Sequence, residues 1–306
     1  MLEVKHVCYG IDGVPILKDI SLGVQKGCIV TIVGPNGCGK STLLKIISRI
    51  LRPQSGEVLL DGCDVRTANT RSLARRMAIL PQRKNVAVDL TVEQLVQYGR
   101  YPHTGFGGKL TKRDIDKVDE AMHAAGIETL RNRAIGTLSG GESQMAWIAM
   151  CLAQAPEIIL LDEPTTYLDI CYQLEVLELV RHLNRAYAMT IVMVLHDINQ
   201  AAQYSDIVYM MKDGEIYNTG APKDIFFQSL LRMYSVLRCG RLLTGTMNIM
   251  CLNAWFGAER RTYEKNCCLR KRRYWKIHYG IECGNCVGSA GIYSHASRMR
   301  SQVGFK

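Results

Sequence analysis

Hydrophobic and polar positions near the start of the chain follow first a strand pattern and then a helix pattern. Residues 28–34, "CIVTIVG", form a short β-branched run that ends at a glycine. Residues 40–51, "KSTLLKIISRIL", place apolar side chains at helical spacing. The pattern predicts a strand, a glycine loop and a helix in direct succession.

Strands and helices continue to alternate further along the chain. We predict strands at 157–164, 189–197 and 207–216, separated by helices at 171–187 and 198–205. Strands that alternate with helices indicate right-handed crossovers and a parallel sheet.

Three other segments have the alternation that is typical of antiparallel strands: 2–10, 15–24 and 56–65. We therefore expect a small antiparallel sheet beside the parallel one. Residues 92–153 are mostly helical in pattern, with a glycine-rich interruption at 98–111. No internal repeat or low-complexity linker is visible.

Length and composition are those of a globular protein. The chain has 306 residues, of which 47% are hydrophobic, and its longest apolar runs fall short of the ~18 residues that a membrane span needs. The first residues, "MLEVKHVCYG", lack the basic and apolar regions of a secretory signal. We expect a protein that works in the cytosol.

The positive charge is concentrated at the C-terminal end. Residues 239–306 carry 12 Lys and Arg against 3 Asp and Glu, which accounts for most of the net charge of +10. Six of the 12 cysteines and two of the three tryptophans also lie there. We therefore place a domain boundary near residue 238. The six earlier cysteines occur singly and are expected to be reduced structural thiols.

The glycine loop fits the phosphate-loop pattern G-x-x-x-x-G-K-[ST] at Gly34–Ser41, "GPNGCGKS". Its backbone N–H groups and the helix N-terminus are suited to the β- and γ-phosphates of a nucleotide. Lys40 would reach the phosphate oxygens, and Ser41 would hold Mg²⁺. The strand before it and the helix after it make a chance match improbable.

A second chemical feature is the pair of carboxylates that ends the apolar strand "IILLDEP". Asp162 is suited to Mg²⁺, directly or through water, because ligands bind at the C-terminal ends of parallel strands. Glu163 is suited to orienting or deprotonating an attacking water. The sequence therefore predicts phosphoryl transfer to water.

Seven elements in order carry a resemblance to a known family: Tyr9, the phosphate loop, Gln82 in "LPQ", "LSGGESQ" at 138–144, "LLDEP", "YLD" at 167–169, and His196 in "LHD". Over residues 1 to about 230 the chain resembles the nucleotide-binding subunit of an ATP-binding cassette (ABC) transporter. The resemblance implies an α/β fold: a P-loop NTPase (RecA-like) core with a flanking antiparallel β-subdomain and an inserted α-helical subdomain. We assign residues 1–238 to this domain and about 84–152 to its helical subdomain.

The resemblance also implies a head-to-tail homodimer. In such dimers the signature loop of one subunit, here Ser139, Gly140, Gly141 and Glu142, covers the γ-phosphate held by the phosphate loop of the other. Two ATP molecules would thus be shared between two chains. The signature departs mildly from the family's commonest form, because Glu142 stands where Gln is usual and Ser143 where a basic residue is frequent.

The remaining roles also follow from the resemblance. Tyr9 would stack on adenine, Gln82 would approach Mg²⁺ and the water, His196 would contact the γ-phosphate, and Asp169 would lie at the dimer interface. The predicted catalytic residues are Glu163, His196, Gln82 and Lys40, and the predicted Mg²⁺ ligands are Ser41, Gln82 and Asp162. The remaining predicted ATP contacts come from the phosphate loop: Gly34, Pro35, Asn36, Gly37, Cys38, Gly39, Lys40, Ser41 and Thr42.

Segments such as "YGRYPH" and "LDEPTTYLDI" resemble the family branch that serves iron–siderophore, haem and cobalamin importers. This branch implies an integral-membrane permease, an indirect extracytoplasmic substrate-binding protein, and a place at the cytoplasmic face of the inner membrane. A ferric siderophore is the expected cargo, with haem or cobalamin as alternatives. No nucleic acid is expected, because the chain lacks the long insertion or tandem cassette of the DNA- and ribosome-acting classes.

The C-terminal tail matches no known pattern, and three hypotheses remain open. A shifted reading frame near residue 230 would explain its composition and would leave a C-terminally damaged cassette. Cys283 and Cys286, with Cys267, Cys268 or His278, would make a zinc site. The basic run "RKRRYWK" at 270–276 would bind anionic lipid or RNA.

Overall fold

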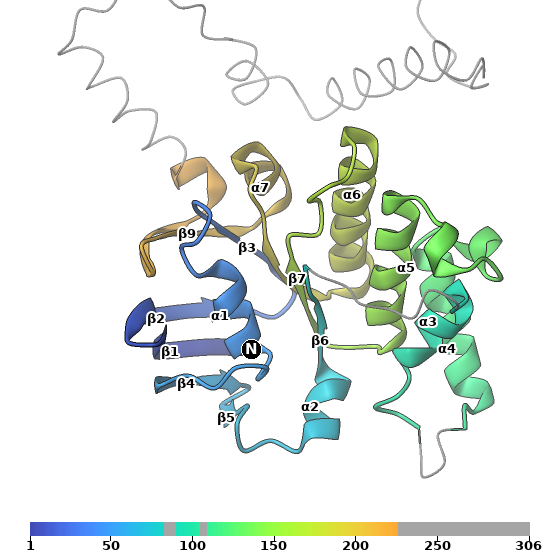
Figure 1. The fold of residues 1–306 in the computed structure, drawn as a ribbon, viewed down its shortest axis with the longest axis horizontal. Coiled ribbons are helices and arrows are strands. Elements are labelled where there is room, and N and C mark those ends of the chain that lie inside the picture. The colour runs from blue at the N-terminus through green and yellow to red at the C-terminus, as the bar shows by residue number, and fades with distance from the viewer. Residues whose placement is uncertain (83–89, 105–108, 226–306) are drawn as a thin grey trace, which may run out of the picture. The chain divides into compact units, whose positions relative to one another are not determined.

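The structure is a computed structural model that describes residues 1–82, 90–104 and 109–225 of the chain. The predicted domain boundary near residue 238 and the three hypotheses for the tail lie outside these residues. The described part contains two sheets with helices packed around them (Figure 1).

The larger sheet has the strand order β10-β9-β3-β8-β7-β6 in the described part of the chain. Its neighbouring strands pair in parallel from β9 to β6, which confirms the predicted parallel sheet. The strands are β3 (Ile29–Val33), β6 (Met77–Leu80), β7 (Ile158–Asp162), β8 (Thr190–Val194), β9 (Ile207–Lys212) and β10 (Glu215–Gly220).

The strand predicted at 207–216 is wrong in one respect, because the segment folds as a hairpin. β9 and β10 pair antiparallel across a turn at Asp213 and Gly214, whose φ angles are 51° and 83°. An Asp-Gly pair favours this kind of two-residue turn, which needs positive φ at both positions.

Two elements were missed entirely. Helix α2 (Thr70–Arg76) leads directly into strand β6 (Met77–Leu80), which forms the edge of the larger sheet beside β7. The apolar run "MAIL" is too short to show a period. The omission matters because β6 delivers Gln82 to the site.

The smaller sheet is antiparallel, as predicted, with the order β2-β1-β4-β5. The segment predicted as one strand at 56–65 forms two, because the chain turns at Asp61 and Gly62. The strands are β1 (Leu2–Ile11), β2 (Val14–Val24), β4 (Ser55–Leu60) and β5 (Cys63–Asp64).

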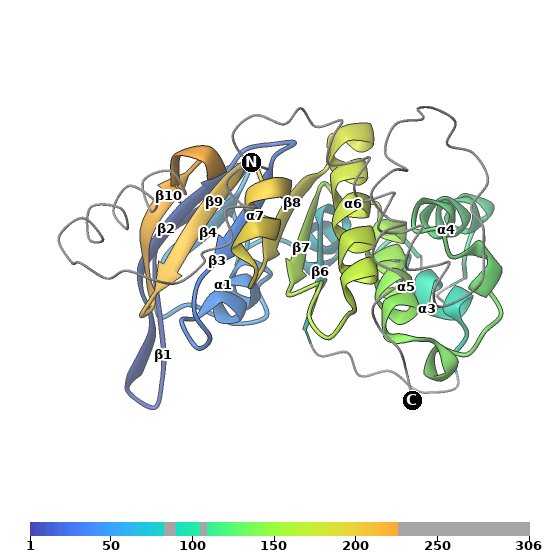
Figure 2. The ribbon, with the colours of Figure 1, turned by 90° about the horizontal axis from the view of Figure 1, so that it is seen from above.

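The helices lie on different sides of the larger sheet. In Figures 1 and 2, α3, α4 and α5 lie together at the side of the sheet away from β1 and β2, while α1 lies on the side of the small sheet. The α-helices not yet given bounds are α1 (Lys40–Ile47), α3 (Val92–Tyr98), α4 (Lys112–Ala124), α5 (Gly140–Ala153), α6 (Ile170–Tyr187) and α7 (Ile198–Tyr204), and the short 3₁₀ helices are η1 (Glu128–Leu130) and η2 (Ile135–Thr137).

Both faces of the larger sheet are buried, which explains its continuous apolar strands. In β7, Ile159 and Leu161 pack in the hydrophobic cluster on the side of α5 and α6. Ile158 and Leu160 pack in the cluster with α1 and the small sheet. The two-residue period of a strand thus sends alternate side chains into two separate hydrophobic clusters.

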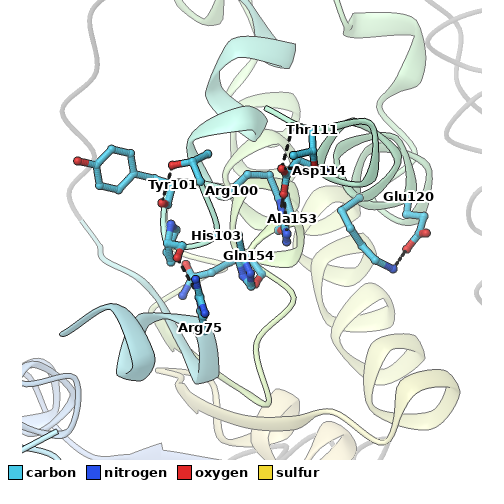
Figure 3. Close-up of polar contacts among 12 residues, drawn as sticks. Arg75, Arg100, Tyr101, His103, Thr111, Asp114, Glu120, Ala153 and Gln154 are labelled. Atoms are coloured by element: carbon cyan, nitrogen blue, oxygen red, sulfur yellow. Dashed lines mark hydrogen bonds and ion pairs between the residues drawn. The ribbon is translucent and has the colours of Figure 1, made fainter. Parts of the chain in front are cut away.

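A buried ion pair ties the helices α3, α4 and α5 together (Figure 3). Arg100 follows α3 and Asp114 lies in the first turn of α4; their side chains are 5% and 7% exposed, with 2.9 Å between Arg100 Nη2 and Asp114 Oδ1. Arg100 Nη1 also donates to the Ala153 carbonyl at the end of α5, at 2.7 Å. Among the described residues, every helix is too short or too polar to cross a membrane.

Candidate functional site

The phosphate loop joins the end of β3 to the start of α1. Gly39 caps α1 in the left-handed region, with φ of 100°, and a Cβ there would lie 2.6 Å from Leu17 Cδ2. Only glycine therefore fits without displacing β2. Lys40 is 5% exposed, and its Nζ donates to the carbonyl oxygens of Gly34 and Pro35, at 2.8 Å each. The lysine is thus held inside the curve of the loop.

A hydroxyl and a carboxylate meet beneath the loop. Ser41 Oγ donates to Asp162 Oδ1 at 2.8 Å, which joins the first turn of α1 to the end of β7. Burial of the Asp162 carboxyl raises its pKa, and the hydrogen bond from Ser41 acts in the opposite direction. These two oxygen donors suit a hard cation of the Mg²⁺ type.

No cluster of three or more His, Cys, Asp or Glu that could hold a metal ion occurs among the described residues. Mg²⁺ does not need one, because it usually keeps several waters and takes only one or two carboxylates plus phosphate oxygens. The oxygen ligands present therefore fit a Mg²⁺ ion whose remaining ligands are water and the phosphate oxygens of a nucleotide.

Glu163 is the centre of a second polar group. Gln82 Nε2 donates to Glu163 Oε2 at 2.6 Å, and Thr166 Oγ1 donates to the same oxygen at 3.1 Å. His196 Nε2 lies 2.5 Å from Glu163 Oε1. The glutamate side chain is 9% exposed, and its backbone φ is +52°, in the left-handed region. This strained backbone is a cost that active sites often carry.

Ser41 and the polar group around Glu163 share one pocket of about 610 Å³, which is in the usual range for small-molecule sites, whereas Asp162 lines a second, smaller pocket. Its lining includes the phosphate-loop residues from Asn36 to Thr42 other than Cys38, together with Gln82, Glu163 and His196. Five segments that are far apart in the sequence therefore supply one cavity, because Ile16 of β2 also lines it. Cys38 is buried, with its N–H 3.4 Å from the Pro35 carbonyl oxygen.

The signature loop starts a helix, α5. Ser139 is the N-cap of α5, and its hydroxyl accepts from the Glu142 N–H at 3.3 Å, while its own N–H donates to the Glu142 carboxylate at 2.8 Å. A second pocket of about 180 Å³ is lined by Gly140, Gln82, Asp162 and Glu163, among others. Ser139, Gly141 and Glu142 line neither pocket.

Tyr9 and Asp169 also lie away from both pockets. Tyr9 is half-buried in β1, opposite Leu17 of β2. Asp169 is exposed and caps α6, because its carboxylate accepts from the Tyr172 N–H at 3.0 Å. The structure therefore does not bring these two predicted residues together with Lys40 and Glu163 within one chain.

Three residues of the larger pocket were not predicted as site residues: Ile16, Thr166 and Tyr167. Tyr167 has a φ of +64° and is 94% exposed, which is unusual for a tyrosine. Thr166 follows Glu163 closely, and a hydroxyl three residues after a catalytic carboxylate is a signal that could have identified it. No local signal marks Ile16.

Comparisons with known proteins agree with this geometry. A family model described as ABC transporter matches residues 17–166. The petrobactin import ATP-binding protein FpuC of Bacillus anthracis is 43% identical over 232 residues, 76% of this chain and 85% of that protein. The ferric enterobactin transport ATP-binding protein FepC of Escherichia coli strain K12 is 42% identical over 238 residues, 78% of this chain and 88% of that protein.

A solved dimeric structure of a bacterial ABC transporter cassette has the same fold, with a TM-score of 0.65 and 30% identity. The match covers 72% of this chain and 99% of that one. The P-loop NTPase fold, the order of the motifs and the extent of these matches agree. The chain therefore belongs to the ABC transporter family, as an ATP-hydrolysing subunit of a transport system.

Proposed function

We propose that this chain is the ATP-binding subunit of an importer that takes up a ferric siderophore or a similar iron(III) chelate. The observation that carries the proposal is the contact of Glu163 with Gln82 and His196 in the pocket that also holds Lys40. The names of the relatives support the cargo, because FpuC is named for petrobactin import and FepC for ferric enterobactin transport.

The phosphate loop would bind the β- and γ-phosphates of ATP through backbone N–H groups and the Lys40 ammonium. Ser41 and Asp162 would hold Mg²⁺, with Gln82 approaching it once released from Glu163. When bound, Mg²⁺ supplies positive charge that offsets the charge of the phosphate oxygens. Tyr9 would stack on the adenine, which would then lie outside this pocket, because Tyr9 does not line it.

Glu163 would orient and polarise the attacking water. Its position is favourable because Gln82 and Thr166 both donate to one carboxylate oxygen, which leaves the other beside His196. His196 would contact the γ-phosphate and stabilise charge that develops on it. Lys40, which lines the same pocket, would act on the same group.

The active form would be a head-to-tail homodimer. Ser139, Gly140, Gly141 and Glu142 of one subunit would cover the γ-phosphate bound by the other, with Asp169 at the interface. This arrangement is supported by the position of Ser139 and Asp169 outside the single-chain pocket. Both residues would then reach a nucleotide only across the interface.

The dimer would work at the cytoplasmic face of the cell membrane, bound to an integral-membrane permease. The permease contact would involve the region from Gln82 to His103. Tyr98, the last residue of α3, and Tyr101, just after it, support this region, because they are 55% and 72% exposed. An extracytoplasmic substrate-binding protein would deliver the chelate to the permease.

Light scattering of the full chain tests the ATPase part of the proposal. The Glu163→Gln variant should dimerise with ATP, because hydrolysis no longer reopens the dimer. Gly140→Asp, added to that variant, should prevent dimerisation. Gly140 suits this control because a Cβ there meets no atom nearer than 3.7 Å, whereas at Gly141 it would lie 2.2 Å from the Tyr172 ring. Dimerisation that survives Gly140→Asp would contradict the proposal.

The cargo needs a separate experiment in cells. A strain lacking this chain should lose growth on ferric siderophores as the iron source and regain it with the intact gene, but not with Lys40→Ala. Uptake of radioactive iron as the siderophore complex, haem or labelled cobalamin should fall only for the siderophore. Loss of haem or cobalamin uptake alone would move the assignment to those cargoes.

A further inference from the structure

The signature loop of this chain carries an ionised carboxylate at the helix N-terminus that, in the proposed dimer, would receive a phosphate. The Ser139 N–H donates to Glu142 Oε2 at 2.8 Å, and the hydrogen bonds from Ser139 lower the pKa of the Glu142 carboxyl. A carboxylate in the first turn stabilises its own helix. It also repels the γ-phosphate that the same helix N-terminus would receive.

Arg133 faces this carboxylate. Its guanidinium Nη2 donates to the Thr137 carbonyl oxygen at 2.9 Å, and Nη1 lies 3.5 Å from Glu142 Oε1. The hydrogen bond to the Thr137 carbonyl holds the guanidinium between η2 and α5, while 47% of the Arg133 side chain remains exposed. The pair is therefore open enough to meet a ligand that arrives from another subunit.

The backbone around Arg133 is held by the start of α3. The Val92 N–H donates to the Arg133 carbonyl at 3.0 Å, and the Ile135 N–H donates to the Leu90 carbonyl at 2.8 Å. Arg131 supports the same segment through an ion pair with Glu93, at 2.7 Å. The place of Arg133 beside the signature loop is thus set by tertiary contacts.

We propose that Arg133 is a positioning residue for ATP-driven dimerisation, which offsets the charge of Glu142 so that the N-terminus of α5 accepts the γ-phosphate of the partner subunit's ATP. The inference rests on the head-to-tail dimer of the proposed function. Among the ion pairs of the described residues, the cationic partner of Glu142 is Arg133. Ser143, directly after Glu142, supplies no charge.

The test uses the full chain with Glu163→Gln and measures, by light scattering, the ATP concentration that gives half-maximal dimerisation. Arg133→Met should raise this concentration about three- to tenfold in about 50 mM NaCl. The increase should shrink at about 500 mM NaCl, because salt screens repulsion between exposed charges. Arg133→Lys keeps the positive charge, so its ATP concentration for half-maximal dimerisation should lie close to that of the parent.

A double-mutant comparison separates charge from structure. In a Glu142→Gln background, Arg133→Met should change the ATP requirement by less than about twofold, since glutamine keeps the capping box without the charge. Arg131→Met is the matched control, because Arg131 lies on the same segment and pairs with Glu93 and Asp119 instead. Arg131→Met should change the ATP requirement by the same factor with and without Glu142→Gln.

Two results would overturn the inference while leaving the proposed function intact. One is an unchanged ATP requirement for Arg133→Met. The other is an equal increase in both Glu142 backgrounds, with no dependence on salt. If the Glu163→Gln parent fails to dimerise with ATP at all, the head-to-tail dimer itself is wrong, and the role of Arg133 falls with it.

Discussion

The side-chain amide of Gln82 donates to the Glu163 carboxylate at 2.6 Å, although 81 residues separate them in the sequence. The contact exists because β6 and β7 are parallel neighbours, so the residues that follow them lie side by side at the C-terminal ends of the strands. The phosphate loop follows β3 and His196 follows β8, so both lie at the same C-terminal ends of the parallel strands. The site is therefore a product of strand order.

Replacing Glu163 by Gln should lower the rate of ATP hydrolysis by about 10²- to 10⁴-fold, because the amide cannot accept the proton of the water. ATP binding should persist, since Lys40 and the phosphate loop are unchanged. Steady-state phosphate release and equilibrium nucleotide binding check both statements. Glu175→Gln on the exposed face of α6 is the control and should have full activity. A Glu163→Gln rate within tenfold of the parent would exclude the glutamate as the base.

Replacing Thr166 by Val should lower kcat about three- to tenfold with little change in KM. The reason is that Glu163 Oε2 loses one of its two donors, so the carboxylate is less well oriented. Thr166→Ser keeps the hydroxyl and should restore the rate. The pH dependence of kcat provides the second measurement. Equal activity of the Val and Ser variants would show that the hydroxyl has no role.

Replacing Gly39 by Ala should destabilise the protein by about 2–3 kcal/mol and abolish ATP binding, because the new Cβ would meet Leu17 at 2.6 Å and the Ile16 carbonyl oxygen at 3.0 Å. Gly37 is the matched comparison. It also has positive φ, but no atom lies within 4 Å of its Cβ position, so Gly37→Ala should cost only about 1 kcal/mol. Urea denaturation measures both. Equal losses would contradict the close approach of the loop to β2.

Asp114 makes part of the folding stability depend on pH. Hydrogen bonds from Thr111 and the interactions with Arg100 lower its pKa to about 2. The unfolded value is about 3.9, so the folded state binds fewer protons in this range. The stabilisation is therefore complete above about pH 4 and is lost as the pH falls towards 2.

Replacing Asp114 by Asn should remove about 3 kcal/mol at pH 7, because Arg100 stays buried without its carboxylate. The variant should also lose less stability than the parent between pH 4 and pH 2. Urea denaturation at several pH values measures the difference, with the exposed Asp116→Asn on the same helix as the control. A variant whose acid sensitivity matches the parent would rule out this contribution.

Much of the fold follows from local sequence. The apolar strand at 158–162 and the helix at 170–187 were predicted within a few residues, because their patterns are long and regular. In the structure, Ser139 and Asp169 cap the starts of α5 and α6, and both are residue types that are typical of N-caps. Short elements were the exception: four apolar residues of β6 carry no detectable period.

The sequence by itself predicted which residues carry the chemistry: the phosphate loop and the Asp-Glu strand end are local patterns, and the resemblance to the ABC transporter family added Gln82 and His196. Only the tertiary structure decided which of them meet. Strand order brings Gln82, Glu163 and His196 together, while Tyr9 and Asp169 stay outside the pocket. It also places Arg133 against Glu142. These contacts depend on the packing of distant segments, and no period or cap in consecutive residues encodes that packing.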